Sequence, residues 1–173
     1  QNALGWMYYK GNGVPQDYAK AKELYEKAIL KNNAQAMHNL SLLYIYGKDV
    51  VQDYNKAIQL LQKSIELNNT SAMTTLGWMY EKGKGVTENS YTAFEWYEKA
   101  ADKGDAQAMN NLGWMYYKGN GGVPQDYTKA KYWYEKAIEK GNEQALNNLA
   151  YLYRDGNGVS KNILYAIELF EKA

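Results

Sequence analysis

Apolar and polar positions recur along the chain with a period of 36 or 37 residues. A series of leucines and a series of alanines show this spacing: Leu4, Leu40, Leu76, Leu112 and Leu149, and Ala21, Ala57, Ala93, Ala130 and Ala166. Within each period, two segments carry small or apolar residues at the three- and four-residue spacing of an amphipathic helix. The pattern predicts five copies of a helix pair, at residues 1–33, 34–69, 70–105, 106–142 and 143–173.

Polar residues and glycines predict where these helices begin and end. Asp or Asn precedes the first helix at Asn33, Asn69, Asp105 and Asn142, and the second helix at Asp17, Asp53, Asn89, Asp126 and Asn162. Such side chains accept hydrogen bonds from the free N–H groups of a helix start. Glycine follows the first helix at Gly11, Gly47, Gly83, Gly119 and Gly156. Glycine readily adopts the left-handed conformation that stops a helix. We therefore expect an all-α chain of nine or ten helices in antiparallel pairs.

One face of each helix is expected to form the core. In the first helices, a small residue on this face lets the paired helix approach closely; it is Gly5, Ser41, Gly77, Gly113 or Ala150. In the second helix of the second copy, the buried stripe is predicted to be Ala57, Leu60, Leu61 and Ser64. The equivalent stripe of the third copy is Ala93, Trp96, Tyr97 and Ala100, so Trp96, and Trp133 in the fourth copy, are also predicted to be core residues.

The composition narrows the class of function. The chain of 173 residues has 20 Lys and Arg against 19 Asp and Glu, a net charge of +1, so it lacks the basic balance typical of nucleic-acid binding. No apolar segment approaches the roughly 18 residues of a membrane span. There is no cysteine and only one histidine, His38, which argues against thiol catalysis, disulfides, His-rich metal sites and His-based triads. We expect no enzyme activity, no metal and no cofactor.

The fourth copy carries a specific motif. Its residues are Ala108, Leu112, Gly113, Tyr116, Gly119, Gly121, Val123, Asp126, Ala130, Trp133, Tyr134, Lys136 and Ala137. This pattern resembles the Sel-one-like repeat, a branch of the tetratricopeptide superfamily, and the resemblance covers essentially the whole chain. It implies an α-solenoid with a right-handed superhelix and a scaffold or adaptor that binds other proteins or peptides. The second copy departs most, because Ser41 replaces glycine and residues 47–50 read GKDV.

Residues opposite the predicted core of the first helices are the candidate binding residues. The resemblance implies that this face lines the concave side of the superhelix. The candidates are Asn2, Trp6, Tyr9, His38, Leu42, Thr74, Trp78, Glu81, Asn110, Trp114, Tyr117, Lys118, Asn147, Tyr151 and Arg154. An aromatic row edged by amides suits a groove for an extended protein segment, and Asn110 and Asn147 could bond to its backbone. Alternatively, the rings pack across neighbouring copies and close the groove.

Two other classes of function stay open. The array could be a spacer or could self-assemble end to end through Leu164, Ile167 and Phe170, since neither end shows a polar cap. The missing caps, and a first residue that lies within a predicted helix, equally suggest a fragment of a longer chain. A cell-wall-associated hydrolase is the remote alternative, because cysteine-rich members of the family have been linked to cell-wall glycan. This chain has no cysteine, and no catalytic partner recurs beside His38. Its compartment is unknown.

Overall fold

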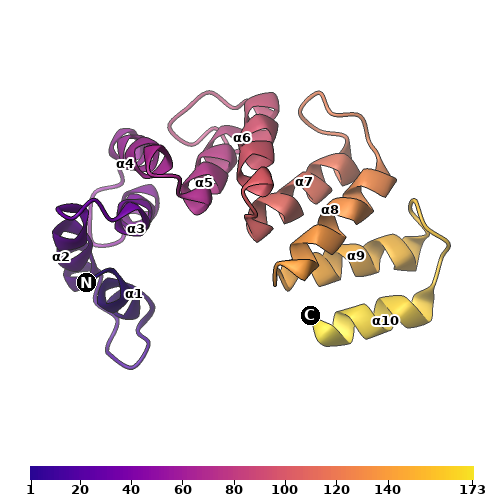
Figure 1. Cartoon of the computed structure of the whole chain (residues 1–173), viewed down its shortest axis with the longest axis horizontal. Coiled ribbons are helices and arrows are strands. Elements are labelled where there is room, and N and C mark those ends of the chain that lie inside the picture. The colour runs from indigo at the N-terminus through magenta and orange to yellow at the C-terminus, as the bar shows by residue number, and fades with distance from the viewer. The chain divides into compact units, whose positions relative to one another are not determined.

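The computed structural model describes all residues from 1 to 173 and contains ten helices and no strand (Figure 1). The helices pair in chain order, so the all-α expectation is confirmed. They are α1 (Asn2–Lys10), α2 (Tyr18–Ile29), α3 (Ala34–Tyr46), α4 (Tyr54–Glu66), α5 (Thr70–Glu81), α6 (Ser90–Asp102), α7 (Ala106–Lys118), α8 (Tyr127–Glu139), α9 (Gln144–Asp155) and α10 (Ile163–Lys172).

The predicted helix boundaries are confirmed. At α2, Asp17 accepts a hydrogen bond from the backbone N–H of Lys20, and all the other predicted cap residues do the same three residues ahead. The glycine after each first helix has a positive φ, from 60° at Gly83 to 75° at Gly156. A non-glycine residue would be strained in this left-handed region, so the glycine series fixes where the first helix of each copy ends.

One backbone hydrogen bond ties the two helices of every pair together. The N–H of the cap residue before the second helix donates to the carbonyl of a tyrosine near the end of the first, as from Asp17 to Tyr8 at 2.9 Å and from Asp126 to Tyr116 at 2.9 Å. The same bond recurs from Asp53 to Tyr44, from Asn89 to Tyr80 and from Asn162 to Tyr153. The loop therefore holds each antiparallel pair in the same register.

A glycine against a tyrosine ring forms the centre of three helix pairs. A Cβ atom built on Gly113 in α7 would lie 2.5 Å from two ring carbons of Tyr134 in α8. The equivalent distances from Gly5 to Tyr25 and from Gly77 to Tyr97 are 2.7 and 2.8 Å. All three rings are buried, so the helices approach as closely as they do only because the glycine has no side chain.

The predicted core position of two tryptophans was wrong. Trp96 in α6 and Trp133 in α8 are only half-buried, and the adjacent Tyr97 and Tyr134 fill the pair contact instead. Trp and Tyr are consecutive and both fall within the apolar arc of the helix, so the periodicity did not separate them. The glycine in the facing helix determines which ring is buried, because the space that it leaves lies opposite the tyrosine.

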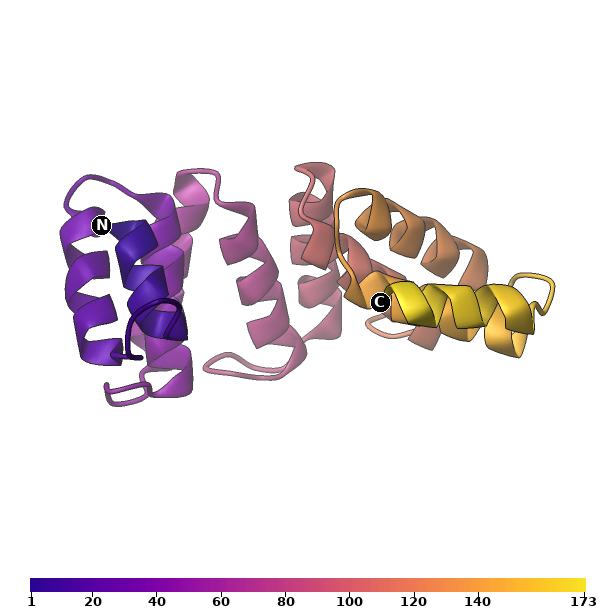
Figure 2. The ribbon, with the colours of Figure 1, turned by 90° about the horizontal axis from the view of Figure 1, so that it is seen from below.

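The chain divides into two compact units, an N-terminal unit of Gln1–Leu76 and a C-terminal unit of Gly77–Ala173, and the division falls within α5. In the N-terminal unit, α1 to α4 pack successively on one another. In the C-terminal unit, α6 to α10 do the same, and Figure 2 shows the helices of both units from a second direction. In each unit the first helices of neighbouring copies touch, α1 with α3 and α7 with α9.

Replacing Gly113 by alanine should destabilise the C-terminal unit, because the new methyl group would overlap the ring of Tyr134. Overpacking of this kind costs about 1–3 kcal/mol, against about 1 kcal/mol gained from the higher helix propensity of alanine. In a Tyr134→Leu background, which copies Leu61 of the second copy, the same change should become neutral or stabilising. Urea unfolding of the four proteins measures both effects.

Tyr134→Leu lowers stability by itself through lost packing. The change in unfolding free energy caused by Gly113→Ala is therefore measured within each background, and the two changes are compared. An equal effect of Gly113→Ala in both backgrounds would show that the tyrosine ring is not what requires the glycine.

Candidate functional site

Polar side chains link the first helices of consecutive copies in the N-terminal unit. Asn39 in α3 donates from Nδ2 to Oδ1 of Asn2 in α1, at 3.0 Å. One copy further along, Nε2 of His38 in α3 lies 2.9 Å from Oγ1 of Thr75 in α5. Both junctions use the same two helix positions, because each of these residues has its equivalent 36 positions along the sequence. The polar pairs therefore set how one first helix stacks on the next.

The C-terminal unit repeats this arrangement. Asn148 in α9 donates to Oδ1 of Asn110 in α7 at 2.8 Å, at the positions that Asn39 and Asn2 occupy in the other unit. The cap residue Asn142 also donates to Gln107 in α7 at 3.1 Å. The contact with Asn148 gives the buried amide of Asn110 a hydrogen-bond partner.

Three predicted site residues thus lie inside the stack of helices. His38, Thr74 and Asn110 are buried, and the amide oxygen of Asn110 is bonded to Asn148 rather than pointing to open surface. Asn147 is half-buried. The side chains next in sequence, Asn39, Thr75 and Asn148, were not predicted to matter and supply the other half of each pair. Their recurrence 36 or 37 residues apart was the available signal.

Two matching clusters of aromatic rings stay at the surface, one in each unit. In α7, Trp114 stacks on Tyr117 with ring centres 5.6 Å apart and an angle of 16° between the planes. The Nζ atom of Lys118 lies 4.9 Å from the centre of the Trp114 ring, and Tyr127 at the start of α8 tilts against Tyr117 at 5.5 Å. We call Trp114, Tyr117, Lys118 and Tyr127 the C-terminal aromatic cluster.

The N-terminal aromatic cluster, Trp6, Tyr9, Lys10 and Tyr18, has the same geometry. Trp6 stacks on Tyr9 at 5.3 Å and 12°, and Lys10 lies 4.9 Å above the Trp6 ring. Tyr18 at the start of α2 contacts Tyr9 edge-on at 5.5 Å. Partial burial raises the pKa of Tyr9, and the neighbouring tyrosines raise it further. Both clusters come from the same nine letters, GWMYYKGNG, at residues 5–13 and 113–121.

The tryptophans of these clusters are open to solvent. Trp6 is 37% exposed and Trp114 is 43% exposed, and Tyr151, the equivalent residue in α9, is 41% exposed. Leu42 and Trp78 at the equivalent positions of the second and third copies are half-buried. The predicted aromatic row is therefore open in the first, fourth and fifth copies.

A hollow of about 190 Å³ lies beside the C-terminal aromatic cluster, between α7 and α9. Besides the cluster, its wall includes side chains of α8 and α9; these are Tyr134, Asn148, Tyr151, Arg154 and Asp155. The guanidinium of Arg154 lies 4.8 Å from the Tyr151 ring centre. It also pairs with Asp155 through Nε and Nη2, at 2.7 and 2.9 Å. These hydrogen bonds lower the pKa of Asp155, and Lys161 lowers it further. In the N-terminal unit, a hollow of about 260 Å³ is lined by Asn2, Ala3, Trp6, Gln35 and Asn39.

Glu81 at the end of α5 contacts side chains of its own copy. Its carboxylate accepts a hydrogen bond from the hydroxyl of Tyr97 at 2.8 Å and pairs with Lys82 at 2.6 Å. Burial raises the pKa of Tyr97, and the neighbouring carboxylate raises it further. The equivalent hydroxyl of Tyr25 is buried without a partner.

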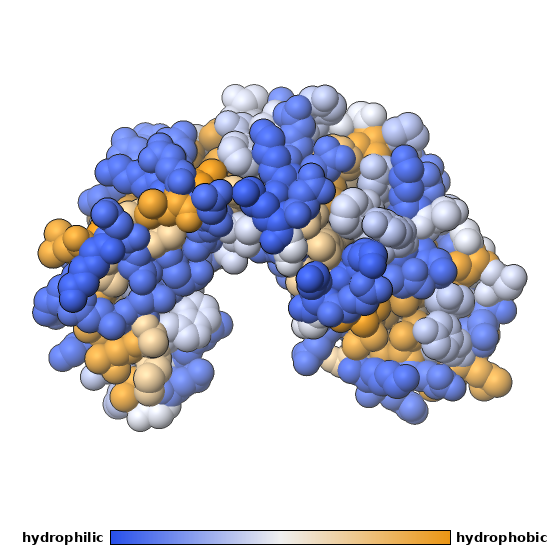
Figure 3. Space-filling model, viewed as in Figure 1, coloured by the Kyte–Doolittle hydropathy of each residue, from blue (hydrophilic) through white to orange (hydrophobic).

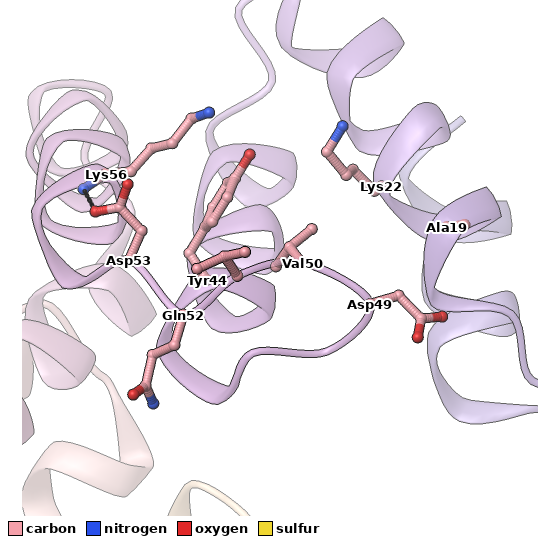
Figure 4. A pocket seen from close by; sticks show the side chains of 9 residues that line it. Ala19, Lys22, Tyr44, Asp49, Val50, Gln52, Asp53 and Lys56 are labelled. Carbon is pink, nitrogen blue, oxygen red and sulfur yellow. Dashed lines mark hydrogen bonds between the residues drawn. The ribbon is translucent and has the colours of Figure 1, made fainter.

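A wider hollow of about 600 Å³ opens on the other side of the N-terminal unit, where the loop of the second copy departs from the motif. Figure 4 shows Tyr44 between Lys56 and Lys22, with Asp49 and Asp53 on the same loop. The Nζ atom of Lys56 lies 4.6 Å from the Tyr44 ring centre. Two lysines face two carboxylates here, so the hollow offers no net charge to a ligand.

The shape of this hollow follows from one substitution. Asp49 has φ of 51° at a position where the fifth copy has Gly158. A Cβ atom on Gly158 would lie 2.6 Å from Cβ of Tyr127 in the preceding second helix. Asp49 carries a Cβ atom, so its loop cannot approach α2 in the same way, and the hollow remains between them.

Polar residues cover much of the face drawn in Figure 3, with apolar patches among them. No three His, Asp or Glu side chains gather as a metal site would require. None of the ten helices is long and apolar enough to cross a membrane.

Helix pairs that stack with equivalent contacts within each unit define an α-solenoid repeat protein. The Sel1 repeat profile matches five consecutive segments, at residues 1–33, 34–69, 70–105, 106–142 and 143–173. The chain therefore belongs to the Sel1 repeat family. Proteins of this family generally serve as protein-interaction scaffolds, and the fold is typically non-catalytic. No curated protein matches the chain.

Solved structures support this membership. A Sel1 repeat protein from Oxalobacter formigenes is 33% identical, with a TM-score of 0.85 over 99% of this chain and 69% of its own. The protective antigen c5321 of uropathogenic Escherichia coli is 32% identical, with a TM-score of 0.61 over 99% of this chain and 44% of its own. Helicobacter pylori cysteine rich protein B is 30% identical, with a TM-score of 0.56 over 72% of this chain and 93% of its own.

Removing the Tyr97 hydroxyl should lower the free energy of unfolding, whereas removing the Tyr25 hydroxyl should not. Tyr97→Phe deletes a hydrogen bond to a carboxylate, a loss of about 1.5–3 kcal/mol in unfolding free energy. Tyr25→Phe deletes a buried hydroxyl without a partner and should leave stability unchanged or raise it by about 1 kcal/mol. The fifth copy already has phenylalanine here, Phe170. Chemical denaturation gives both values, and an equal cost for the two variants would contradict the assignment.

Proposed function

We propose that this protein is an interaction scaffold that docks segments of partner proteins on its two aromatic clusters. The observation that carries the proposal is the exposure of Trp6 and Trp114, each held in a fixed stack in its own unit. Tryptophan, tyrosine and arginine are the residues that most often dominate protein interfaces. Family membership supports the scaffold role, and the clusters are the proposed docking points.

The fixed geometry of the clusters favours docking. Stacking on Tyr117 and contact with Lys118 restrict Trp114 before any partner arrives. A pre-ordered side chain loses less conformational entropy on binding, so more of the contact energy appears as affinity. The polar pairs that stack α7 on α9, and α1 on α3, hold the helices that carry the rings.

The 15 residues predicted from sequence contribute unequally to this proposal. Trp6, Tyr9, Trp114, Tyr117, Lys118, Tyr151 and Arg154 supply the contact surface. Asn2, His38 and Asn110 support it by fixing the stack. An extended segment is the proposed ligand, because in the C-terminal unit Trp114 and Tyr151 lie on consecutive first helices, α7 and α9.

End-to-end self-association is the second candidate function, because Leu164 and Ile167 of α10 are exposed apolar residues. Analytical ultracentrifugation of the chain and of Leu164→Lys would test it. Lack of concentration-dependent association in the unmodified chain would contradict it.

The docking proposal predicts a large loss of affinity in Trp114→Ala and in Trp6→Ala. Peptides selected on the purified chain from a random displayed library serve as ligands, and calorimetry gives their dissociation constants. An anchoring tryptophan contributes about 2 kcal/mol or more, so a peptide that uses either cluster should bind roughly 25-fold more weakly to the matching variant. Thermal stability should change little, because both rings lie at the surface.

The matched control is Tyr132→Ala in α8, an exposed aromatic residue outside both clusters, which should leave affinity unchanged. Selected peptides that bind both tryptophan variants at full strength would overturn the docking proposal.

A further inference from the structure

The two aromatic clusters contain the same stacked group of Trp, Tyr and Lys, but the neighbouring first helix differs between them. This group has the same rings, the same stacking and the same 4.9 Å contact between lysine and tryptophan in both units. In the N-terminal unit, the α3 positions equivalent to the α9 side of the hollow hold Leu42, the buried Ile45 and Tyr46, none of them charged. At the equivalent positions, α9 of the C-terminal unit presents Tyr151, Arg154 and Asp155. The charged side chains on α9 therefore distinguish the C-terminal site from the N-terminal one.

From this difference we propose that the hollow between α7 and α9 selects a partner segment in which an apolar side chain adjoins an acidic one. The proposal rests on the docking function above and assigns the chemistry of the partner at one of its two sites. The apolar side chain enters between Trp114 and Tyr151, and the carboxylate meets Lys118 and Arg154 at the rim.

The volume of the hollow fits a single side chain. About 190 Å³ is well below the roughly 300–1,000 Å³ of sites for small-molecule ligands. Its deeper wall includes the buried ring of Tyr134 and its opening lies between exposed rings. One large apolar side chain is the occupant that this size and lining favour.

The charges at the rim favour an anion and disfavour a cation. Lys118 comes from α7 and Arg154 from α9, so two cations of different helices converge on one opening, against the single carboxylate of Asp155. Asp155 engages the Nε and Nη2 groups of Arg154, which leaves three of the five guanidinium N–H donors for another carboxylate. The aromatic faces that a cationic ligand would use already carry Lys118 at 4.9 Å and Arg154 at 4.8 Å. At the N-terminal cluster Lys10 contacts the Trp6 ring and Lys48 lies over the more distant Tyr18 ring at 5.6 Å, and no arginine stands opposite Trp6.

Three blocked dipeptides test the preference: acetyl-Phe-Glu-amide, acetyl-Phe-Gln-amide and acetyl-Phe-Lys-amide. The Glu and Gln peptides have nearly the same shape and differ in charge, and the Lys peptide carries the opposite charge. The indole N–H signals of the five tryptophans are followed by NMR in the whole chain, with Trp→Phe variants to assign them. At Trp114 the Glu peptide should bind about 5-fold more tightly than the Gln peptide, the upper range for an exposed charge pair. The Lys peptide should bind most weakly. At Trp6 the affinities of the three peptides should differ by less than at Trp114.

Two surface variants should shift the preference in opposite directions. Arg154→Gln should remove the advantage of the Glu peptide at Trp114, because it deletes one cation and leaves Asp155 unpaired. Asp155→Asn should strengthen binding of the Glu peptide, because it frees the guanidinium and removes the opposing charge. Arg154→Lys keeps the charge and should retain part of the advantage. None of the three variants should alter binding at Trp6, which serves as the internal control.

The outcomes separate the two proposals. Equal binding of all three peptides at Trp114, unaffected by Arg154→Gln and Asp155→Asn, would overturn the charge preference and leave docking on the clusters intact. No response at either Trp6 or Trp114 to any peptide would overturn docking of apolar side chains on the clusters, and the preference with it.

Discussion

The close approach of two helices at a glycine is the contact on which each repeat depends. In three copies a tyrosine ring covers the bare glycine backbone so closely that even a methyl group would overlap it. Where the small residue carries a Cβ, as Ser41 and Ala150 do, the facing residue is Leu61 or Phe170 instead of tyrosine. In the second copy the smaller Leu61 matches the larger Ser41, because a closely packed interior accepts extra volume on one side only when the other side yields it. In the fifth copy Phe170 keeps the ring but is only half-buried.

This contact also decides which side chains reach the surface. With the tyrosine turned into the pair, Trp96 and Trp133 are left half-buried at its edge. In the first helices the same geometry directs Trp6 and Trp114 away from the core. The amide and hydroxyl pairs then join successive first helices at a single pair of positions. The close contact at the centre of these three helix pairs is thus between a ring and a glycine, whereas the link between first helices is polar and directional.

The individual character of the array comes from departures from its motif. Asp49 replaces a glycine and leaves a wide, charge-balanced hollow beside α2. Arg154, the only arginine, stands opposite a cluster that the first copy builds against apolar residues. Repeats of one design can therefore present different chemistry at equivalent places, which is how a scaffold with equivalent sites distinguishes between partners.

The sequence alone determined the helices, their caps and stops, the five copies and the family, because these depend on local hydrogen bonds and on a period that recurs in register. It also placed the exposed tryptophans opposite the core. It did not reveal that His38, Thr74 and Asn110 are buried or that Glu81 accepts a hydrogen bond from Tyr97. Nor did it reveal that Tyr134 is buried while Trp133 is only half-buried. Those outcomes depend on which neighbouring helix lies against each face. Only tertiary packing settles this, because a helical period fixes the direction of a side chain but not what covers it.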